Sequence, residues 1–137
     1  MLGEYVINHG RITSTKNTVA LLAGEEVLIA EQGDYLFVKS QAPKQSQLAG
    51  VENTGKVNSE GGSVYFGAGD LYALAIKDSG IIKSSEVKIE GGQSGLVEIS
   101  GPIDASNNNP GASGGQIAVL GETIAIKQGA QLNASGE

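Results

Sequence analysis

Short apolar runs alternate with stretches rich in Gly, Asn and Ser along the whole chain. The runs are four to six residues long and rich in Val, Ile and Leu, which is typical of β-strands. The residues between them favour turns. The pattern therefore predicts an all-β fold of many short strands joined by tight corners. The clearest runs lie at 18–23, 26–30, 63–68, 95–100, 116–121 and 123–126.

One short motif recurs, and it sets a period for the chain. It reads apolar, any, Asn or Asp, any, Gly, any, apolar, any, Ser or Ala, with full copies at 6–14, 51–59 and 76–84. Weaker copies keep the Gly and some of the positions after it. The resulting anchor glycines are Gly10, Gly33, Gly55, Gly80, Gly101 and Gly129, spaced 21 to 28 residues apart. That spacing is typical of one coil of a solenoid.

The repeat predicts a parallel β-helix of about five to six coils, forming a single domain over 1–137. One coil cannot bury its inward face alone, and stacking coil on coil buries it. Small residues and glycines suit the corners. Asn8, Asn53 and Asp78 occupy the same motif position, so we expect them to form a polar ladder that bonds to the backbone beside each corner.

Two alternatives compete with this interpretation. The first is that the segments 18–31 and 69–77 form helices, although Gly24 disfavours a helix in 18–31 by about 1 kcal/mol. A β-sandwich also predicts short, evenly spaced strands. It does not require the same motif in each repeat, so the motif favours the solenoid.

Composition narrows the class of partner. The net charge is −6 and there is no Lys/Arg run, which argues against binding to nucleic acid or to an anionic membrane. The chain has no cysteine and no apolar stretch long enough to span a bilayer. Its first residues lack the pattern of a signal peptide, so a secreted protein would contain this chain as part of something longer.

Catalytic and metal-binding chemistry is sparse. His9 is the only histidine and sits beside a corner glycine, so we expect it to be a solvent-facing loop residue. Sites built on His and Cys are excluded by count, and no calcium-binding motif is present. We therefore predict no catalytic residues, no metal and no cofactor. The alternative is a β-helix that binds or degrades polysaccharide, using acidic and aromatic side chains. Its candidates are Glu25, Glu26 and Asp70, with Tyr35, Phe37, Tyr65, Phe66 and Tyr72.

The longest loops are the predicted contact sites. The segment 39–50 is polar and too long for a tight corner, and its candidate residues are Lys39, Pro43 and Lys44. The second loop is 106–113, with Asn107, Asn108 and Asn109. The ends of the solenoid are a further prediction, because no capping helix is visible. Copies of the chain are then expected to associate through exposed strand edges into filaments.

The segment Val51-Glu52-Asn53-Thr54-Gly55-Lys56-Val57 is followed by Gly-rich segments at 61–69, 101–106, 114–121 and 129–136. In the order and density of these segments, the chain resembles the filamentous-haemagglutinin-like exoproteins of bacterial two-partner secretion. The resemblance covers nearly the whole chain. It departs from the family's secretion domain at 107–111, where Asn107-Asn108-Asn109-Pro110-Gly111 lacks an Asn after the proline. The chain is therefore more similar to the stretch that follows the secretion domain, or to part of the shaft, than to the secretion signal itself.

The resemblance implies a right-handed parallel β-helix exported through an outer-membrane transporter. It also implies an extracellular or cell-surface location and a structural, adhesive or biofilm-matrix role without enzymatic activity. The partners expected on this basis are a cell-surface glycan or protein receptor and other copies of the chain.

Overall fold

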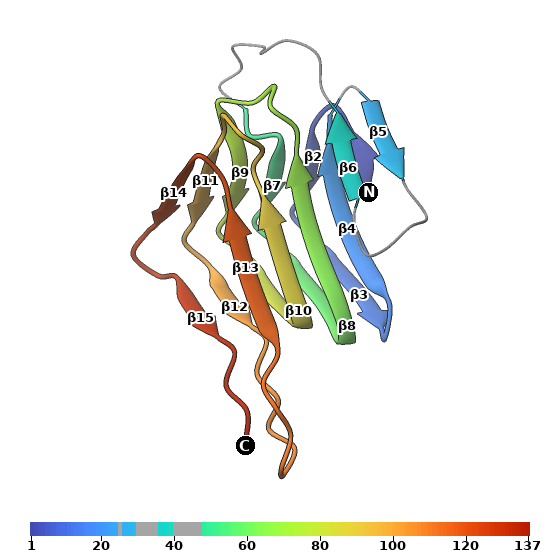
Figure 1. The fold of residues 1–137 in the computed structure, drawn as a ribbon, viewed down its shortest axis with the longest axis vertical. Helices are drawn as coiled ribbons and strands as arrows, with labels where there is room; N and C mark the ends of the chain where they lie inside the picture. Colours follow the sequence, from blue (N-terminus) through green and yellow to red (C-terminus); the bar gives the residue numbers. More distant parts are fainter. Residues whose placement is uncertain (25, 30–35, 40–47) are drawn as a thin grey trace.

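The protein is all-β, with its strands arranged in stacked parallel sheets (Figure 1). The structure, a computed structural model, describes residues 1–24, 26–29, 36–39 and 48–137. Those residues contain no α-helix and hence no helix that could cross a membrane. The predicted all-β class is confirmed, and both helical alternatives are wrong. The runs that suggested helices lie in β4 (Thr18–Ala23), β5 (Glu26–Ile29) and β9 (Leu74–Asp78).

Successive passes of the chain lie over one another, and each pass contributes strands to the same two sheets. The five-stranded sheet contains β2 (Val6–Asn8), β7 (Val51–Asn53), β9, β11 (Leu96–Ile99) and β14 (Thr123–Ile126). The eight-stranded sheet contains β1 (Leu2–Gly3), β3 (Arg11–Thr15), β4, β8 (Lys56–Ala68), β10 (Ile81–Glu90), β12 (Pro102–Asp104), β13 (Gln116–Leu120) and β15 (Gln131–Asn133).

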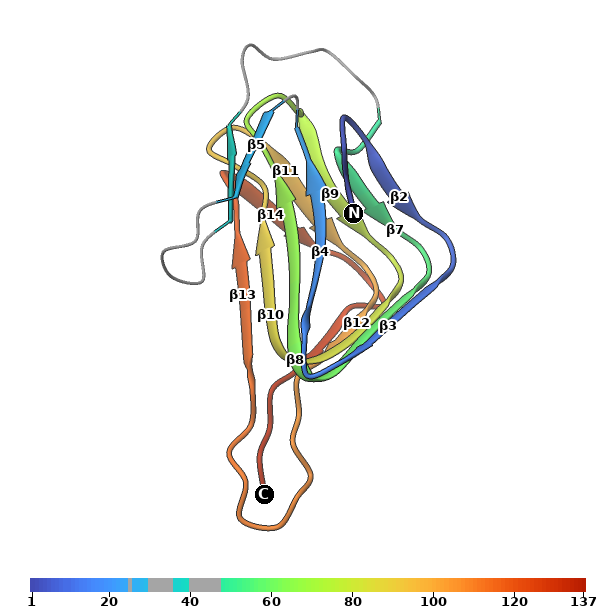
Figure 2. The same ribbon diagram turned by 90° about the vertical axis from the view of Figure 1, so that its right-hand side faces the viewer.

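The long strands of the second sheet bend, so that each pass has three sides in cross-section (Figure 2). The first half of β8 pairs with β3 and its second half pairs with β4. In the same way, β10 pairs with β12 and then with β13. The described residues thus make four passes and the start of a fifth. This arrangement is compatible with a β-helix and excludes an antiparallel sandwich for these passes.

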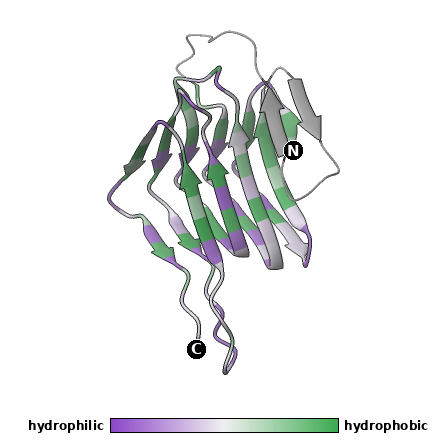
Figure 3. Cartoon of the chain, viewed as in Figure 1, coloured by the Kyte–Doolittle hydropathy of each residue, from purple (hydrophilic) through white to green (hydrophobic). Residues whose placement is uncertain are grey.

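In-register pairing lines up like side chains from pass to pass. On the first side, Val6 aligns with Val51, Ile76, Val97 and Ile124 in turn. Figure 3 shows the result as hydrophobic bands that cross neighbouring strands. The inward members of these rows form one core, and its largest fully buried side chains include Phe66, Leu21, Ile82, Ile89 and Ile103. Burial of these apolar rows is the main stabilising term of the fold, at about 25 cal/mol per Å² removed from water.

The predicted pass at Gly33 is wrong, although Gly33 itself lies outside the described residues. β2 pairs directly with β7, and β4 pairs directly with β8, so no pass lies between them. The intervening chain instead contains β5 and β6 (Leu36–Lys39), which pair antiparallel in a separate two-stranded sheet. The error has a simple cause. Paired residues of the first two passes are 45 positions apart, which is close to two repeat lengths. In the sequence, the segment inserted between β4 and β7 therefore has about the same length as an additional coil.

The two ends of the stack differ. Three inward-facing side chains of the last pass are exposed by about half: Ile124 by 42%, Ile126 by 53% and Leu132 by 44%. At the other end Val6 and Val19 of the first pass are buried, and β1 pairs with the edge of β4, although β2 and β3 each pair with one strand among the described residues. The expectation of an uncovered end therefore fits the C-terminal end.

Candidate functional site

The loop 106–113 is the longest connection between strands of one pass in the described part of the core. It leaves the sheet after β12 and returns to it at β13, and the C-terminal residues run along it (Figures 1 and 2). Asn107 N–H donates to the Ser135 carbonyl at 2.9 Å, and Glu137 N–H donates to the Ala112 carbonyl at 3.0 Å. The tail therefore bonds to both arms of the loop and holds it against the stack.

Asp104 fixes the start of this loop. Its Oδ1 accepts hydrogen bonds from Ser106 N–H at 3.0 Å and from Ser106 Oγ at 2.6 Å. These bonds, together with the nearby Lys83 charge, lower the pKa of the Asp104 carboxyl. The same turn is repeated further on, where Asn107 Oδ1 accepts from Asn109 N–H at 3.2 Å. Asn107 is thus held in place by its own loop.

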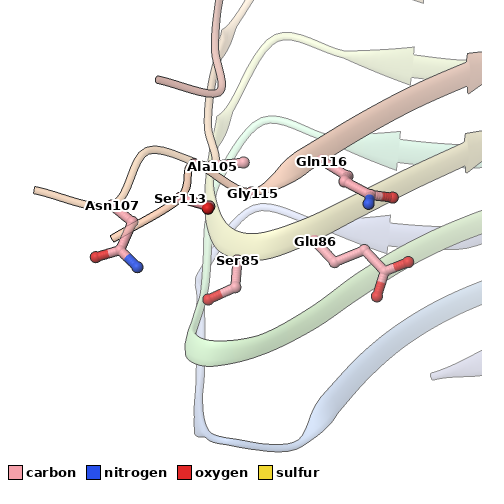
Figure 4. Close-up of a pocket in the computed structure, with 8 residues that line it drawn as sticks. Ser85, Glu86, Ala105, Asn107, Ser113, Gly115 and Gln116 are labelled. Atoms are coloured by element: carbon pink, nitrogen blue, oxygen red, sulfur yellow. The ribbon is translucent and has the colours of Figure 1, made fainter. Parts of the chain in front are cut away.

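Two grooves flank the loop, and Asn107 lines both. The first, of about 360 Å³, is shown in Figure 4 and is lined by Ser85, Glu86, Ala105, Asn107, Ser113, Gly114, Gly115 and Gln116. In that view Glu86 and Gln116 lie along the strands, and Asn107 lies on the other side of the corner. The second groove, also about 360 Å³, is lined by Glu60, Gly61, Lys83, Ser84, Ser85, Ser106, Asn107, Asn108 and Asn109. All three predicted asparagines therefore line a polar groove.

The other predicted loop is only partly described. Lys39 is the last residue of β6, whose partner strand is β5. Pro43 and Lys44 lie outside the described residues. The structure thus brings together the Asn107–Asn109 candidates, and of the 39–50 candidates it describes only Lys39.

The corner formed by the anchor glycines is the most regular feature of the repeat. Gly10, Gly55, Gly80 and Gly101 stack so closely that a Cβ on Gly80 would lie 2.3 Å from the Gly55 carbonyl oxygen. Only glycine allows this approach of backbone to backbone. Gly129 is not part of this column. The residue aligned with Gly101, just before the paired strand, is Ala130, and Gly129 has a φ of +101°.

Beside this column lies the predicted polar ladder. Asn8 Nδ2 donates to Asn53 Oδ1 at 2.8 Å, and Asn53 Nδ2 donates to Asp78 Oδ1 at 2.8 Å. Gly10 N–H and Gly80 N–H donate to the side chains of Asn8 and Asp78, which is the expected turn geometry. All three side chains are buried.

Asp78 is an unusual end for the ladder. Its Oδ2 is buried without a hydrogen-bond partner, and the next residue in the row is Ile99. Burial raises the pKa of Asp78 to about 6, although the hydrogen bonds from Asn53 and Gly80 act in the opposite direction. The group is internal, so it is a structural feature and not a surface site.

A third groove runs along the outside of the glycine column, and sequence reasoning missed it. It has a volume of about 470 Å³ and is lined by His9, Gly10, Arg11, Thr54, Gly55, Lys56, Ser79, Gly80 and Ile81. The lining consists of three anchor glycines, Gly10, Gly55 and Gly80, each with the residue before it and the residue after it in the sequence. Aligning the full motif copies and comparing the positions next to each glycine would have revealed the set.

Other chemistry in the described residues is limited. His9 is exposed at the corner, as expected, and its Nδ1 lies 2.6 Å from Thr54 Oγ1. Of the aromatic candidates, Phe66 and Tyr72 are buried in the core. Tyr65 OH donates to Glu90 at 2.9 Å, while burial raises the Tyr65 pKa. Asp70 accepts from Gln93 N–H and orders a turn. The described residues contain no cluster of three or more His, Asp or Glu side chains that could hold a metal ion.

Comparison with known proteins adds no relative. No family model, no curated protein and no solved structure matches the chain.

Proposed function

We propose that this chain is a structural and adhesive module of a secreted bacterial surface or matrix fibre, built as a right-handed parallel β-helix. The observation that carries the proposal is the in-register stacking of passes, in which apolar rows, a glycine column and a polar ladder all repeat along one direction. Such a stack is stabilised mainly by contacts between neighbouring passes, so it suits an extended shaft.

The proposed mechanism requires no catalysis. The stack supplies a rigid support, and the loop 106–113 with its polar grooves supplies a contact surface. The resemblance of the repeats to two-partner-secretion exoproteins supports an extracellular location, export through an outer-membrane transporter and a receptor on a cell surface.

The C-terminal end supports self-association. β13, β14 and β15 each pair with one strand among the described residues, so each has a second edge to offer. Next to these edges Ile124, Ile126 and Leu132 are exposed. We propose that strands of another copy cover this end, which buries the apolar side chains and pairs the backbone groups.

Sedimentation velocity of the full chain over a wide concentration range tests the proposal. We expect concentration-dependent assembly that the variant Ile126→Glu reduces, because a charge would have to be buried at the covered end. Ile81→Glu is the matched control, since Ile81 is similarly exposed but lies on the side of the stack. A wild-type chain that stays monomeric at high concentration would contradict self-association, as would equal assembly of Ile126→Glu.

The second candidate function is polysaccharide binding or degradation. The Ser- and Asn-lined grooves favour binding, because such side chains offer both donors and acceptors to sugar hydroxyls. Each groove has one carboxylate in its lining, Glu86 in the first and Glu60 in the second. Glycoside hydrolysis generally uses a pair of carboxylates across the bond, so we propose binding without turnover.

A further inference from the structure

We infer that the groove along the glycine column binds an acidic polysaccharide, with Arg11 and Lys56 holding the carboxylates of its uronate residues. The inference rests on the proposed adhesive function in that it names the class of ligand. It places the contact at a different surface from the loop 106–113.

Two neighbouring cations on this surface are left uncompensated by the fold. Arg11 and Lys56 are paired residues on neighbouring strands, so their side chains leave the sheet about 4.8 Å apart. Like charges directly opposite each other destabilise a sheet. Neither side chain has a carboxylate partner within the part of the chain that the structure describes. In a chain of net charge −6, an isolated cationic pair is an attractive point for an anion.

The shape of the groove favours a polymer. Gly10, Gly55 and Gly80 form its floor, and the absence of side chains there leaves about 470 Å³ open. The groove crosses three passes, so it runs along the stacking direction and not along a single strand. An extended polymer fits such a groove better than a small compact ligand does.

The two walls of the groove differ in chemistry. His9, Thr54 and Ser79 supply hydrogen-bonding groups on one side. The opposite wall carries Arg11, Lys56 and then Ile81, which is 41% exposed. Carboxylates suit the cations, hydroxyls suit the polar wall, and the C–H face of a sugar ring suits an exposed isoleucine. These three features together match a uronate polymer. Nucleic acid is disfavoured for a different reason, because the lining of the groove contains no Tyr, Phe or Trp on which bases could stack.

Calorimetric titration of the full chain with polygalacturonate tests the inference. We expect saturable binding that weakens about tenfold in the double variant Arg11→Gln/Lys56→Gln, because two charge-assisted contacts are lost. The matched control is Lys77→Gln/Lys127→Gln, which changes the net charge by the same amount. Lys77 lies in β9 and Lys127 directly follows β14, so both are on a different side of the stack from the groove. This control should bind as the wild type does. Equal loss in both double variants, or loss in neither, would overturn the inference.

A second variant tests the same groove without removing the cations. Ile81→Glu places a carboxylate next to Lys56 in the same row, since these two residues are paired. It should compete with the ligand and weaken binding, whereas Ile126→Glu at the C-terminal end should not. The same two variants have the opposite expected effects on assembly, so failure of the groove and failure of the proposed self-association are distinguishable.

Three further polymers establish the class of ligand. Neutral dextran should not bind, because the cations then have no partner. Dextran sulfate, which carries sulfates but no carboxylates, tests whether sulfate replaces carboxylate. Tighter binding of dextran sulfate than of polygalacturonate would overturn the assignment to uronates, and tighter binding of double-stranded DNA would overturn the assignment to a polysaccharide.

Discussion

At the scale of single residues, the most informative group is the ladder Asn8–Asn53–Asp78. Its members were predicted from their shared motif position, and the structure joins them by two hydrogen bonds of 2.8 Å. The sequence did not indicate that the ladder ends on a carboxyl group with one buried, unpartnered oxygen. That property depends on Ile99, the next residue of the row, which is apolar.

Asp78 should make the protein less stable as the pH rises. Its pKa is raised to about 6 in the fold from 3.8. The folded state therefore disfavours the ionised form, and the penalty grows from about pH 4 to about pH 6. From the size of the shift, we expect Asp78→Asn to gain on the order of 3 kcal/mol in unfolding free energy relative to wild type between pH 4 and pH 7. Urea denaturation at several pH values measures this difference.

Asp104→Asn serves as the control with the opposite sign. The Asp104 pKa is lowered by its bonds to Ser106, so the stability that this carboxylate contributes is lost as the pH falls through its folded pKa. If the stability of Asp78→Asn relative to wild type does not depend on pH, Asp78 is not buried as the structure has it.

At the scale of elements, the corners decide how closely the strands stack. The glycine column allows carbonyl groups of one pass to lie where a Cβ of the next would be. Gly10, Gly55 and Gly80 do not have positive φ angles, so their backbone conformation does not require glycine. The close contact between passes is therefore the reason for glycine at positions 55 and 80. Among the anchors that the structure describes, only Gly129, outside the column, has a left-handed backbone.

Gly80→Ala should destabilise the protein by about 2 kcal/mol or more, through overpacking that forces the backbone apart. The added Cβ would lie 2.3 Å from the Gly55 carbonyl oxygen. Gly10→Ala is the matched control, because its nearest neighbour would be Asn8 Oδ1 at 3.9 Å. We expect that change to alter stability by less than about 1 kcal/mol. Thermal unfolding of both variants measures the contrast, and equal effects would contradict the stacked column.

At the scale of the whole molecule, the stack is asymmetric. Val6, Val19 and Leu21 of the first pass are buried, whereas Ile124, Ile126 and Leu132 of the last pass are exposed. Among the described residues, central strands such as β8 and β10 pair on both sides, while β14 and β15, like β2 and β3 at the other end, pair on one side, so the asymmetry lies in side-chain burial. In a stack held by contacts between neighbours, stability should therefore fall toward the C-terminal end.

Amide hydrogen exchange on dilute protein should follow this gradient. We expect slow exchange in β8 and β10 and much faster exchange in β14 and β15, measured by mass spectrometry of peptides. Raising the protein concentration should protect β14 and β15 if copies cover that end. Uniform protection along the chain in a dilute monomer would contradict the asymmetry.

The sequence by itself determined the strand class, the inward rows, the glycine corner and the polar ladder, because each depends on a short motif that is contained within one pass and recurs in the next. It did not determine how many passes there are. An excursion with about the length of one repeat, between β4 and β7, has the same spacing as a coil, and only the pairing of β2 with β7 distinguishes them. The groove beside Arg11 and Lys56 was hidden for a related reason. Its walls come from three passes far apart in sequence, and only stacking in register brings them together.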